Sequence, residues 1–323
     1  MKLAEIYMQF QSDIEMIEKE LEANVQAQHD VLTNASLQLL KAGGKRIRPV
    51  FVLLAARFGS YDINSLKHIA APLELIHMGS LVHDDVIDDA DLRRGKKTIK
   101  SQWDNRVAMY TGDFIFGKAL ETSTHFDNPK IHQILSNAMM EMCLGEIEQI
   151  RDQYNLEQNF RIYLRRIKRK TALLIAVSCQ LGALAANASS YIQNQLYRFG
   201  YYVGMSFQIT DDVLDFVGTE KQLGKPAGGD LLQGNVTLPA LYAMYNHDDI
   251  RKQIQSFFQD IEKNAECISD IIAMIKNTNA IQYSIKISDQ YLHKAFETLE
   301  TLPDIIEKKY LYEIASYIGK RKF

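Results

Sequence analysis

Two short aspartate clusters have the spacing that places several carboxylates on one face of a helix. Asp84, Asp85 and Asp88 lie in "HDDVIDDADLRRG", and Asp211, Asp212 and Asp215 lie in "QITDDVLDF". Residues four apart share a helix face, so each cluster points its carboxylates in one direction. Such carboxylates repel one another unless cations neutralise them, and oxygen-only ligands suit Mg²⁺, which often bridges to substrate phosphates. A solvated acidic face or helix-end capping is the alternative, and the repetition on two apolar backgrounds counts against it.

Basic residues are grouped near both clusters. They are Lys45, Arg46 and Arg48 in "GGKRIRP", Arg93 and Arg94 about a turn and a half of helix after the first cluster, Lys170 beside Thr171, and Lys225 in "GKPAGGD". The glycine pair before Lys45 precedes a predicted helix start, where backbone N–H groups also favour an anion. Singly, each is an ordinary surface charge, but together they predict two anion pockets beside metal. Two diphosphate substrates with apolar tails fit such a site.

Helices must position these groups, because apolar residues recur with periods of three and four along nearly the whole chain. Strand-like alternation bounded by tight turns is almost absent. We therefore expect an all-α protein, with residues 1–323 forming a single domain of helices packed round a common centre. The uncharged stretch from Thr171 to Tyr197 contains small and polar residues, so we expect a helix buried on all sides and no membrane span.

Composition excludes several classes of protein. Lys and Arg total 37 against 40 Asp and Glu, for a formal net charge of −3, which argues against coating nucleic acid through bulk charge. The run "RIYLRRIKRK" has only two aromatic residues and is a weak basis for a nucleic-acid site. Cys143, Cys179 and Cys267 form no C-x-x-C pair, and the acid-containing N-terminus does not resemble a signal peptide. We expect a cytoplasmic protein with at most peripheral membrane contact.

The order of the segments "GGKRIRP", "ELIHMGSLVHDDVIDDADLRRG", "KT", "GMSFQITDDVLDF" and "GKPAGGDLLQGNVTLP" closely resembles that of the trans-isoprenyl diphosphate synthases. The dense part of the resemblance covers roughly residues 40 to 245. It implies the isoprenoid synthase fold, a large helical bundle with a central cavity. Within the family, the chain is most similar to the catalytic subunits of two-component synthases that make the heptaprenyl side chain of menaquinone.

The resemblance also implies roles for individual residues. The magnesium ligands would be Asp84, Asp85, Asp88, Asp211 and Asp215. Arg93, Lys170 and Lys225 would hold the allylic diphosphate, and Lys45, Arg48, His77 and Arg94 the isopentenyl diphosphate. Thr171, Gln208 and Asp212 would complete the catalytic site.

The implied reaction depends on electrostatics and needs no protein nucleophile. Mg²⁺ and the cations would stabilise the departing diphosphate, an allylic carbocation would form in a dry pocket, and isopentenyl diphosphate would attack it. The departing diphosphate would act as the base, as the family implies. Farnesyl diphosphate is one allylic starter of this kind.

Product length can be approached from spacing. Ser80 lies one turn, about 5 to 6 Å, before Asp84 on the same helix face, and Gly79 is adjacent. Short-chain members of the family tend to carry aromatic residues at the positions that correspond to Gly79 and Ser80. The small residues therefore imply a longer product, and the alternative is that they permit close helix packing.

Two residues qualify this assignment. Many relatives have a lysine where this chain has Asn235 in "LLQGNVTLP", so one cation near the allylic diphosphate is missing or is replaced by Lys320, Arg321 and Lys322 or by a partner chain. His83 precedes the first cluster, but oxygen-ligated magnesium gives it little reason to bind metal. We interpret His83 as a packing or hydrogen-bonding residue.

Two other classes remain as alternatives. A class I terpene cyclase would share the fold and one D-D-x-x-D, but "GGKRIRP" and the second D-D-x-x-D count against it. A non-catalytic helical interaction subunit would be expected to lack the clusters that this chain keeps. Family habit favours a dimer, and the similarity to two-component synthases favours a smaller non-catalytic partner.

Overall fold

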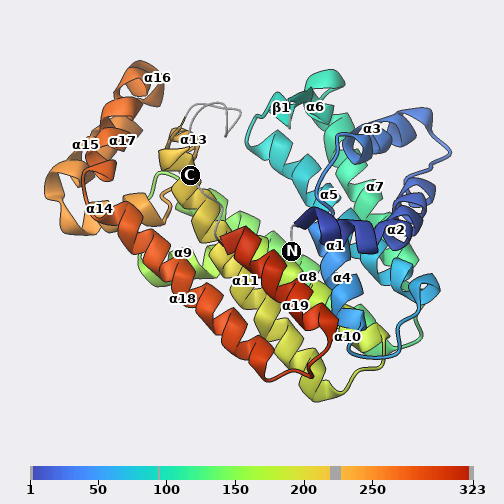
Figure 1. The fold of residues 1–323 in the computed structure, drawn as a ribbon. Coiled ribbons are helices and arrows are strands. Elements are labelled where there is room, and N and C mark those ends of the chain that lie inside the picture. Colours follow the sequence, from blue (N-terminus) through green and yellow to red (C-terminus); the bar gives the residue numbers. More distant parts are fainter. Residues whose placement is uncertain (1–2, 94, 219–226, 320–323) are drawn as a thin grey trace. The chain divides into compact units, whose positions relative to one another are not determined.

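The computed structural model describes residues 3–93, 95–218 and 227–319. The chain forms two compact units, which are described separately. Unit 1 comprises Met1–Met139, Leu174–Gly200 and Thr298–Ile314, and unit 2 comprises Met140–Leu173, Tyr201–Glu297 and Ala315–Phe323. Most of the described residues are helical, which confirms the all-α prediction (Figure 1).

Unit 1 is built from the N-terminal helices and a short hairpin. Its elements are α1 (Leu3–Gln9), α2 (Gln11–Asn24), α3 (Asp30–Lys41), α4 (Ile47–Ala56), α5 (Ile63–Ile87), β1 (Leu92–Arg93), β2 (Lys96–Lys97), α6 (Ile99–Gln102) and α7 (Asn105–Ser123). It also contains the first part of α8 (Pro129–Asp152), nearly all of α10 (Leu173–Ala185), the first part of α11 (Ser190–Val217) and most of α19 (Ile306–Gly319).

Unit 2 contains the remaining parts of α8, α11 and α19. Its other elements are α9 (Phe160–Ile167), the π-helix η1 (Lys168–Ala172), α13 (Gly229–Leu232), α14 (Leu238–Asn246), α15 (Asp248–Gln259), α16 (Ile261–Asn264), the 3₁₀-helix η2 (Ala265–Cys267), α17 (Ile268–Lys276) and nearly all of α18 (Ala280–Glu300).

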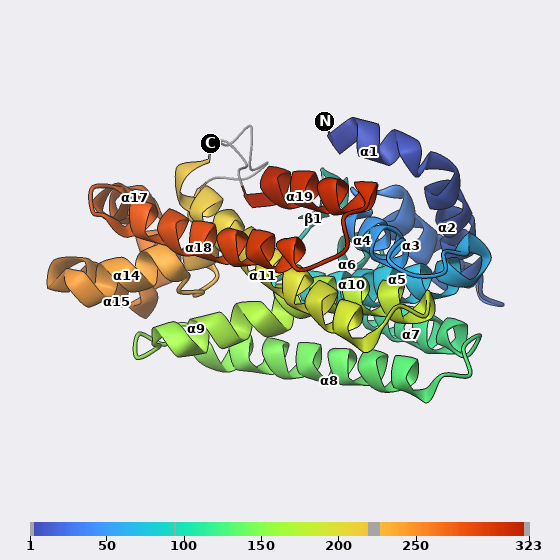
Figure 2. The same cartoon turned by 60° about the horizontal axis from the view of Figure 1, so that its bottom comes forward.

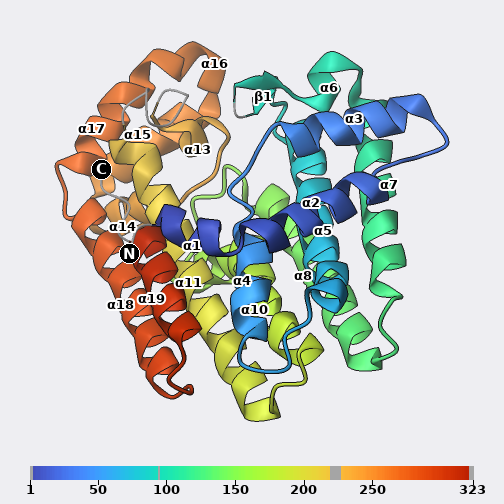
Figure 3. The same ribbon diagram turned by 45° about the vertical axis from the view of Figure 1, so that its right-hand side comes forward.

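Helix α5 is the central helix of unit 1. It begins at an N-cap, because the Asp62 carboxylate accepts the backbone N–H groups of Asn64 and Ser65 at 3.1 and 3.2 Å. Every residue from 69 to 76 is buried, so this part of the helix is enclosed on all faces. It packs against α7, which runs beside it, and against α4 (Figures 1 and 3). This core holds the first aspartate cluster at the end of α5.

The core of unit 2 forms round α11. Ile209, Val213 and Phe216 of this helix are fully buried in an apolar cluster with side chains of α9, α14, α15 and α17. Helix α18 lies along α11 (Figures 1 and 2), where the Ser288 hydroxyl is 2.8 Å from that of Ser206. The second aspartate cluster therefore sits on a helix anchored by its apolar face.

The uncharged stretch from Thr171 to Tyr197 is not one helix, contrary to prediction. It contains the end of η1, helix α10 and the start of α11, with a break at Asn187, whose φ is +55°. Asparagine tolerates this left-handed conformation better than most residues, so the helix can end there. Among the helices that the structure describes, none is long and apolar enough to cross a membrane.

Candidate active site

The first aspartate cluster lies at the C-terminal end of α5. Asp84 and Asp88 are half-buried and Asp85 is buried. The Asp88 N–H donates to the Asp84 carbonyl at 2.8 Å, so the last turn is closed. A helix C-terminus carries partial negative charge, which makes carboxylates there unfavourable unless a cation neutralises them. The position of the cluster therefore favours a bound cation.

Arg93 does not continue the helix after the cluster, contrary to the spacing-based prediction. The chain turns at Asp89, whose φ is +51°, and forms the β1–β2 hairpin, in which Arg93 pairs with Lys96. The hairpin brings Nε and Nη2 of Arg93 to 2.7 Å from Oδ1 of Asp85. Burial raises the pKa of Asp85, and the Arg93 guanidinium opposes this change. Arg93 thus holds the buried member of the cluster, leaving Asp84 and Asp88 as its more accessible carboxylates.

The basic segment at the start of α4 divides according to burial. Lys45 is exposed and Arg48 is half-buried, whereas Arg46 is buried. Nη1 of Arg46 lies 3.1 Å from Oε1 of Glu74, and its guanidinium also pairs with Glu18. The grouping of Arg46 with the anion-binding residues is therefore wrong, because two carboxylates neutralise it. Arg46 instead anchors the segment to α5.

His77, one of the expected isopentenyl diphosphate ligands, lies on the same stretch of α5 as the chain-length residues Gly79 and Ser80. His77 is half-buried, about 10 Å along the helix axis from Asp84. The Ser80 hydroxyl donates to the His77 carbonyl at 2.8 Å and so turns back onto its own helix. A Cβ at Gly79 would lie 3.1 Å from the ring of Phe116 on α7. Gly79 therefore serves close helix packing, whatever its part in product length.

His83 makes the contacts of a packing histidine. Its Nε2 is 3.1 Å from the Met109 carbonyl and 3.3 Å from Oδ1 of Asp113. Its ring packs edge-to-face on Phe116, with centroids 5.5 Å apart. These contacts on α7 account for His83 without a metal.

The second aspartate cluster lies near the C-terminal end of α11. Asp211 is half-buried, and Asp212 and Asp215 are buried. Oδ2 of Asp215 accepts the Asp230 N–H at 3.1 Å, and its carbonyl accepts the Gly228 N–H at 2.8 Å. Asp215 therefore ties the glycine-rich segment after the cluster to α11.

Asp212 is held by neutral donors. The Tyr163 hydroxyl donates to its Oδ2 at 2.6 Å, and the Gln208 amide donates to its Oδ1 at 2.8 Å. Burial raises the pKa of Asp212 to about 7, although these two bonds oppose the change. Burial, and then the Asp212 charge, raise the pKa of Tyr163, so its phenol keeps the proton that it donates.

Lys170 and Thr171 lie in the π-helix η1, a rare element often found at functional sites. Nζ of Lys170 is 3.0 Å from Oε2 of Glu146 on α8. The Thr171 hydroxyl donates to Oε1 of Gln208 on α11 at 2.6 Å. Two successive residues are thus attached to two different helices, and Lys170, Thr171, Gln208 and Asp212 are brought together within unit 2.

Three acidic residues of α8 were not predicted from the sequence. Arg169 pairs with Glu141 at 2.9 Å and with Glu148 at 2.7 Å, and Glu146 pairs with Lys170. The signal available was complementary charge, because "EMCLGEIEQ" is acidic where "RIYLRRIKRK" is basic. Arg166 in that basic run is buried and donates to the Val236 carbonyl at 2.7 Å. These internal contacts explain the run without nucleic acid.

Some predicted residues lie outside the part of the chain that the structure describes. They are Arg94, Lys225, Lys320, Arg321 and Lys322. Asn235, which replaces a family lysine, is buried, and its N–H donates to the Asp230 carbonyl at 2.7 Å.

The donor chemistry of the two clusters fits Mg²⁺. Within residues 3–93, 95–218 and 227–319, no three His, Cys, Asp or Glu side chains are gathered as a ready-made metal site. Mg²⁺ does not require one, because it keeps several waters and binds through one or two carboxylates together with substrate phosphates. Asp84, Asp88 and Asp211 supply half-buried carboxylates of this kind.

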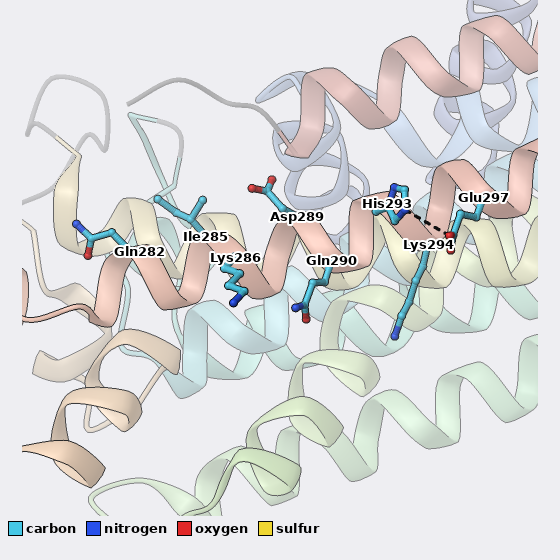
Figure 4. Close-up of a pocket in the computed structure, with 8 residues that line it drawn as sticks. All are labelled: Gln282, Ile285, Lys286, Asp289, Gln290, His293, Lys294 and Glu297. Carbon is cyan, nitrogen blue, oxygen red and sulfur yellow. Dashed lines mark ion pairs between the residues drawn. The ribbon is translucent and has the colours of Figure 1, made fainter.

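A surface groove of about 550 Å³ follows α18 (Figure 4), and none of its lining residues belongs to either aspartate cluster. The described side chains that line it come from this one helix: Gln282, Ile285, Lys286, Asp289, Gln290, His293, Lys294 and Glu297. His293 and Glu297 form an ion pair at 3.3 Å between two exposed side chains. One exposed helix face with mixed charge does not supply the convergent groups of an active site.

Comparison with known proteins gives concordant matches. The family model described as polyprenyl synthetase matches residues 29–275. The chain is 59% identical to heptaprenyl diphosphate synthase component 2 of Bacillus subtilis (strain 168), over 100% of this chain and 92% of that protein. It is 57% identical to the component 2 protein of Geobacillus stearothermophilus, over 100% of both.

Solved structures agree with these matches. The crystal structure of heptaprenyl diphosphate synthase from Staphylococcus aureus is 41% identical and superposes with a TM-score of 0.92, over 97% of this chain and 98% of that chain. A decaprenyl diphosphate synthase from Rhodobacter capsulatus is 27% identical, with a TM-score of 0.93 over 99% of both chains. The chain therefore has the all-α fold of these synthases.

Proposed function

The chain belongs to the polyprenyl synthetase family and is a trans-prenyltransferase, and we propose that it makes all-trans heptaprenyl diphosphate for the menaquinone side chain. It would add isopentenyl diphosphate units to an allylic diphosphate such as farnesyl diphosphate. The observation that carries this proposal is the 57–59% identity to two heptaprenyl diphosphate synthase components over all 323 residues. Residues 1–323 would act as a single catalytic domain.

Mg²⁺ is the proposed cofactor. Asp84, Asp85, Asp88, Asp211 and Asp215 would hold it, with Asp84, Asp88 and Asp211 the more accessible. When bound, Mg²⁺ supplies positive charge that stabilises the diphosphate as it leaves. Asp85 and Asp215 also have partners within the chain, so part of their role is to fix the shape of each cluster.

The cations of the chain would bind the two diphosphates. Arg93, Lys170 and Lys225 are assigned to the allylic diphosphate, and Lys45, Arg48, His77 and Arg94 to isopentenyl diphosphate. The position of Lys170 supports this assignment, since its half-buried ammonium lies in η1 directly before Thr171 and Glu146 holds it there. Thr171, Gln208 and Asp212 would complete the catalytic site, and Gly79 and Ser80 would leave room for a long product.

The active form is proposed to be a dimer with a smaller non-catalytic subunit. The two most similar proteins described above are each named as component 2 of their enzyme.

The proposed location is the cytoplasm. Its reducing conditions fit the three free cysteines of the structure, which are Cys143, Cys179 and Cys267.

The test is product length by mass spectrometry. The purified chain receives Mg²⁺, farnesyl diphosphate and isopentenyl diphosphate, with and without the smaller subunit. We expect heptaprenyl diphosphate only when the subunit is present. Long product from the chain alone would remove the partner from the proposal, and no condensation in either tube would overturn the proposed function.

A further inference from the structure

Tyr163 combines complete burial with a polar task. Its side chain is 0% exposed and packs in the apolar core of unit 2. Its hydroxyl nevertheless donates to Oδ2 of Asp212 at 2.6 Å. A buried hydroxyl needs a partner, but a phenylalanine would fill the same space without that need. The hydroxyl therefore has a reason beyond packing.

In the hydrogen bonds that link Thr171 to Asp212, each group donates to the next one toward Asp212. Both carboxylate oxygens accept, one from Tyr163 and one from the Gln208 NH₂ group at 2.8 Å. With its NH₂ group on Asp212, Gln208 must turn its carbonyl oxygen to the other side. That oxygen accepts the Thr171 hydroxyl at 2.6 Å. A hydroxyl has one proton, so Thr171 can only accept from any further group.

This chain of bonds joins two predicted parts of the site. Thr171 follows Lys170 in the π-helix η1, and Asp212 lies between the predicted metal ligands Asp211 and Asp215 on α11. Tyr163 belongs to α9, which runs directly into η1. The four residues therefore hold the Lys170–Thr171 turn against the aspartate helix.

We propose that Tyr163 is a positioning residue for prenyl transfer, which holds Asp212 and, through Gln208, keeps the Thr171 hydroxyl proton turned away from the substrate. This inference rests on the proposed function. The Thr171 oxygen then presents lone pairs, which favour positive charge on an allylic carbon and offer no proton to a diphosphate oxygen. Loss of the Tyr163 hydroxyl would free Asp212 to rotate and allow Gln208 to reverse its amide.

The first test is Tyr163→Phe, which keeps the ring and removes one hydroxyl. We expect kcat to fall by about tenfold or more, since small misplacements in a site cost up to about 100-fold. The KM for isopentenyl diphosphate should not change, because none of its predicted ligands belongs to the hydrogen-bonded set of Tyr163, Asp212, Gln208 and Thr171. Tyr245→Phe is the matched control: it also removes a hydroxyl bond in unit 2, the 3.0 Å bond to the Gln158 carbonyl, and should leave kcat unchanged.

A double-mutant cycle separates positioning from general support. If Tyr163 acts through Thr171, then Tyr163→Phe should lower kcat less than about twofold in a Thr171→Val background. Independent, multiplicative losses would overturn the proposal, as would a normal kcat in Tyr163→Phe. Asp212→Asn replaces an acceptor with a donor at nearly the same size, and it provides the same cycle if Tyr163→Phe does not fold.

The wild-type chain, with its partner where needed, is assayed first for polyprenyl diphosphate. If it makes none, the proposed function fails and the cycle is not interpreted. If it is active and the cycle shows no coupling, only the role of Tyr163 fails.

Discussion

The two aspartate clusters share the sequence D-D-V-x-D, but the structure stabilises their buried members differently. In unit 1, Asp85 is held by a charged residue, Arg93, eight positions along the chain. In unit 2, Asp212 is held by the neutral donors Gln208 and Tyr163, and Tyr163 lies 49 positions away. Two equal sequence patterns thus hold their second carboxylate in different ways, one through an ion pair and one through neutral hydrogen bonds.

The difference has electrostatic consequences. Burial raises the pKa of both carboxylates, and to about 7 for Asp212; the Arg93 guanidinium opposes the rise at Asp85, and the hydrogen bonds from Tyr163 and Gln208 oppose it at Asp212. The clusters also differ one turn earlier, where α5 has Gly79 and Ser80 and α11 has Ser206 and Phe207. The first cluster therefore combines an ion pair with small residues one turn earlier, and the second combines two neutral donors, of which Tyr163 is distant in the sequence, with the bulkier Phe207.

The largest expected effect concerns the feature that the clusters share. Asp84→Ala or Asp211→Ala should each lower turnover by orders of magnitude, because each removes an accessible carboxylate from a predicted Mg²⁺ site. The helical circular dichroism signal should persist. Asp289→Ala, at an exposed position on α18, is the control and should retain normal turnover. Near-normal turnover in either cluster variant would contradict the metal assignment.

The second prediction concerns the small wall next to the first cluster. Ser80→Phe should shorten the product, because an aromatic ring one turn before Asp84 would block a growing tail. Ser80→Ala should leave product length unchanged, since the Ser80 hydroxyl donates to a carbonyl of its own helix and alanine is no larger than serine. Mass spectrometry of the products distinguishes the two variants. An unchanged distribution in Ser80→Phe would reject the role of this wall.

The third prediction separates the ion pair from the neutral bonds. Arg93→Gln should lower the free energy of unfolding by about 1–3 kcal/mol, because it leaves a buried carboxylate without its charged partner. The loss should disappear in an Asp85→Asn background. Raising the salt concentration should weaken the Arg93–Asp85 coupling, since the Arg93 side chain is 27% exposed.

The matched cycle in unit 2 uses Tyr163→Phe and Asp212→Asn. The side chains of Tyr163 and Asp212 are both buried, so the coupling energy between them should not respond to salt. Urea unfolding at low and high salt measures both cycles. Equal salt dependence in the two cycles would remove the distinction between the clusters.

The smallest expected effect tests the packing of α7 against α5 near the first cluster. Gly117→Ala on α7 should raise the free energy of unfolding by about 0.5–1 kcal/mol, because glycine is unfavourable inside a helix and the new Cβ meets open space. Gly79→Ala should give no such gain, since its Cβ would lie 3.1 Å from the Phe116 ring. Urea unfolding compares the two. An equal gain in both would show that Phe116 can move aside.

Sequence patterns predicted those features that depend on local spacing. The periods of α5 and α11 placed each cluster on one helix face, and the charge of Lys170 beside Thr171 marked a basic residue at the start of the uncharged stretch. Local patterns did not predict the β1–β2 hairpin, the π-helix η1 or the break at Asn187. A few residues with unusual φ values or one extra residue in a turn decide such features, and apolar periodicity is insensitive to them.

The sequence by itself determined the fold class, the family and the two carboxylate clusters, because helical periodicity and D-D-x-x-D spacing are properties of neighbouring residues. The tertiary structure decided which charges are used internally. It turned Arg46 to Glu74, Arg93 to Asp85 and Lys170 to Glu146. It also placed the hydroxyl of Tyr163 on Asp212. The partner of a buried polar group depends on which segments pack together, and that packing depends on contacts between residues distant in the sequence.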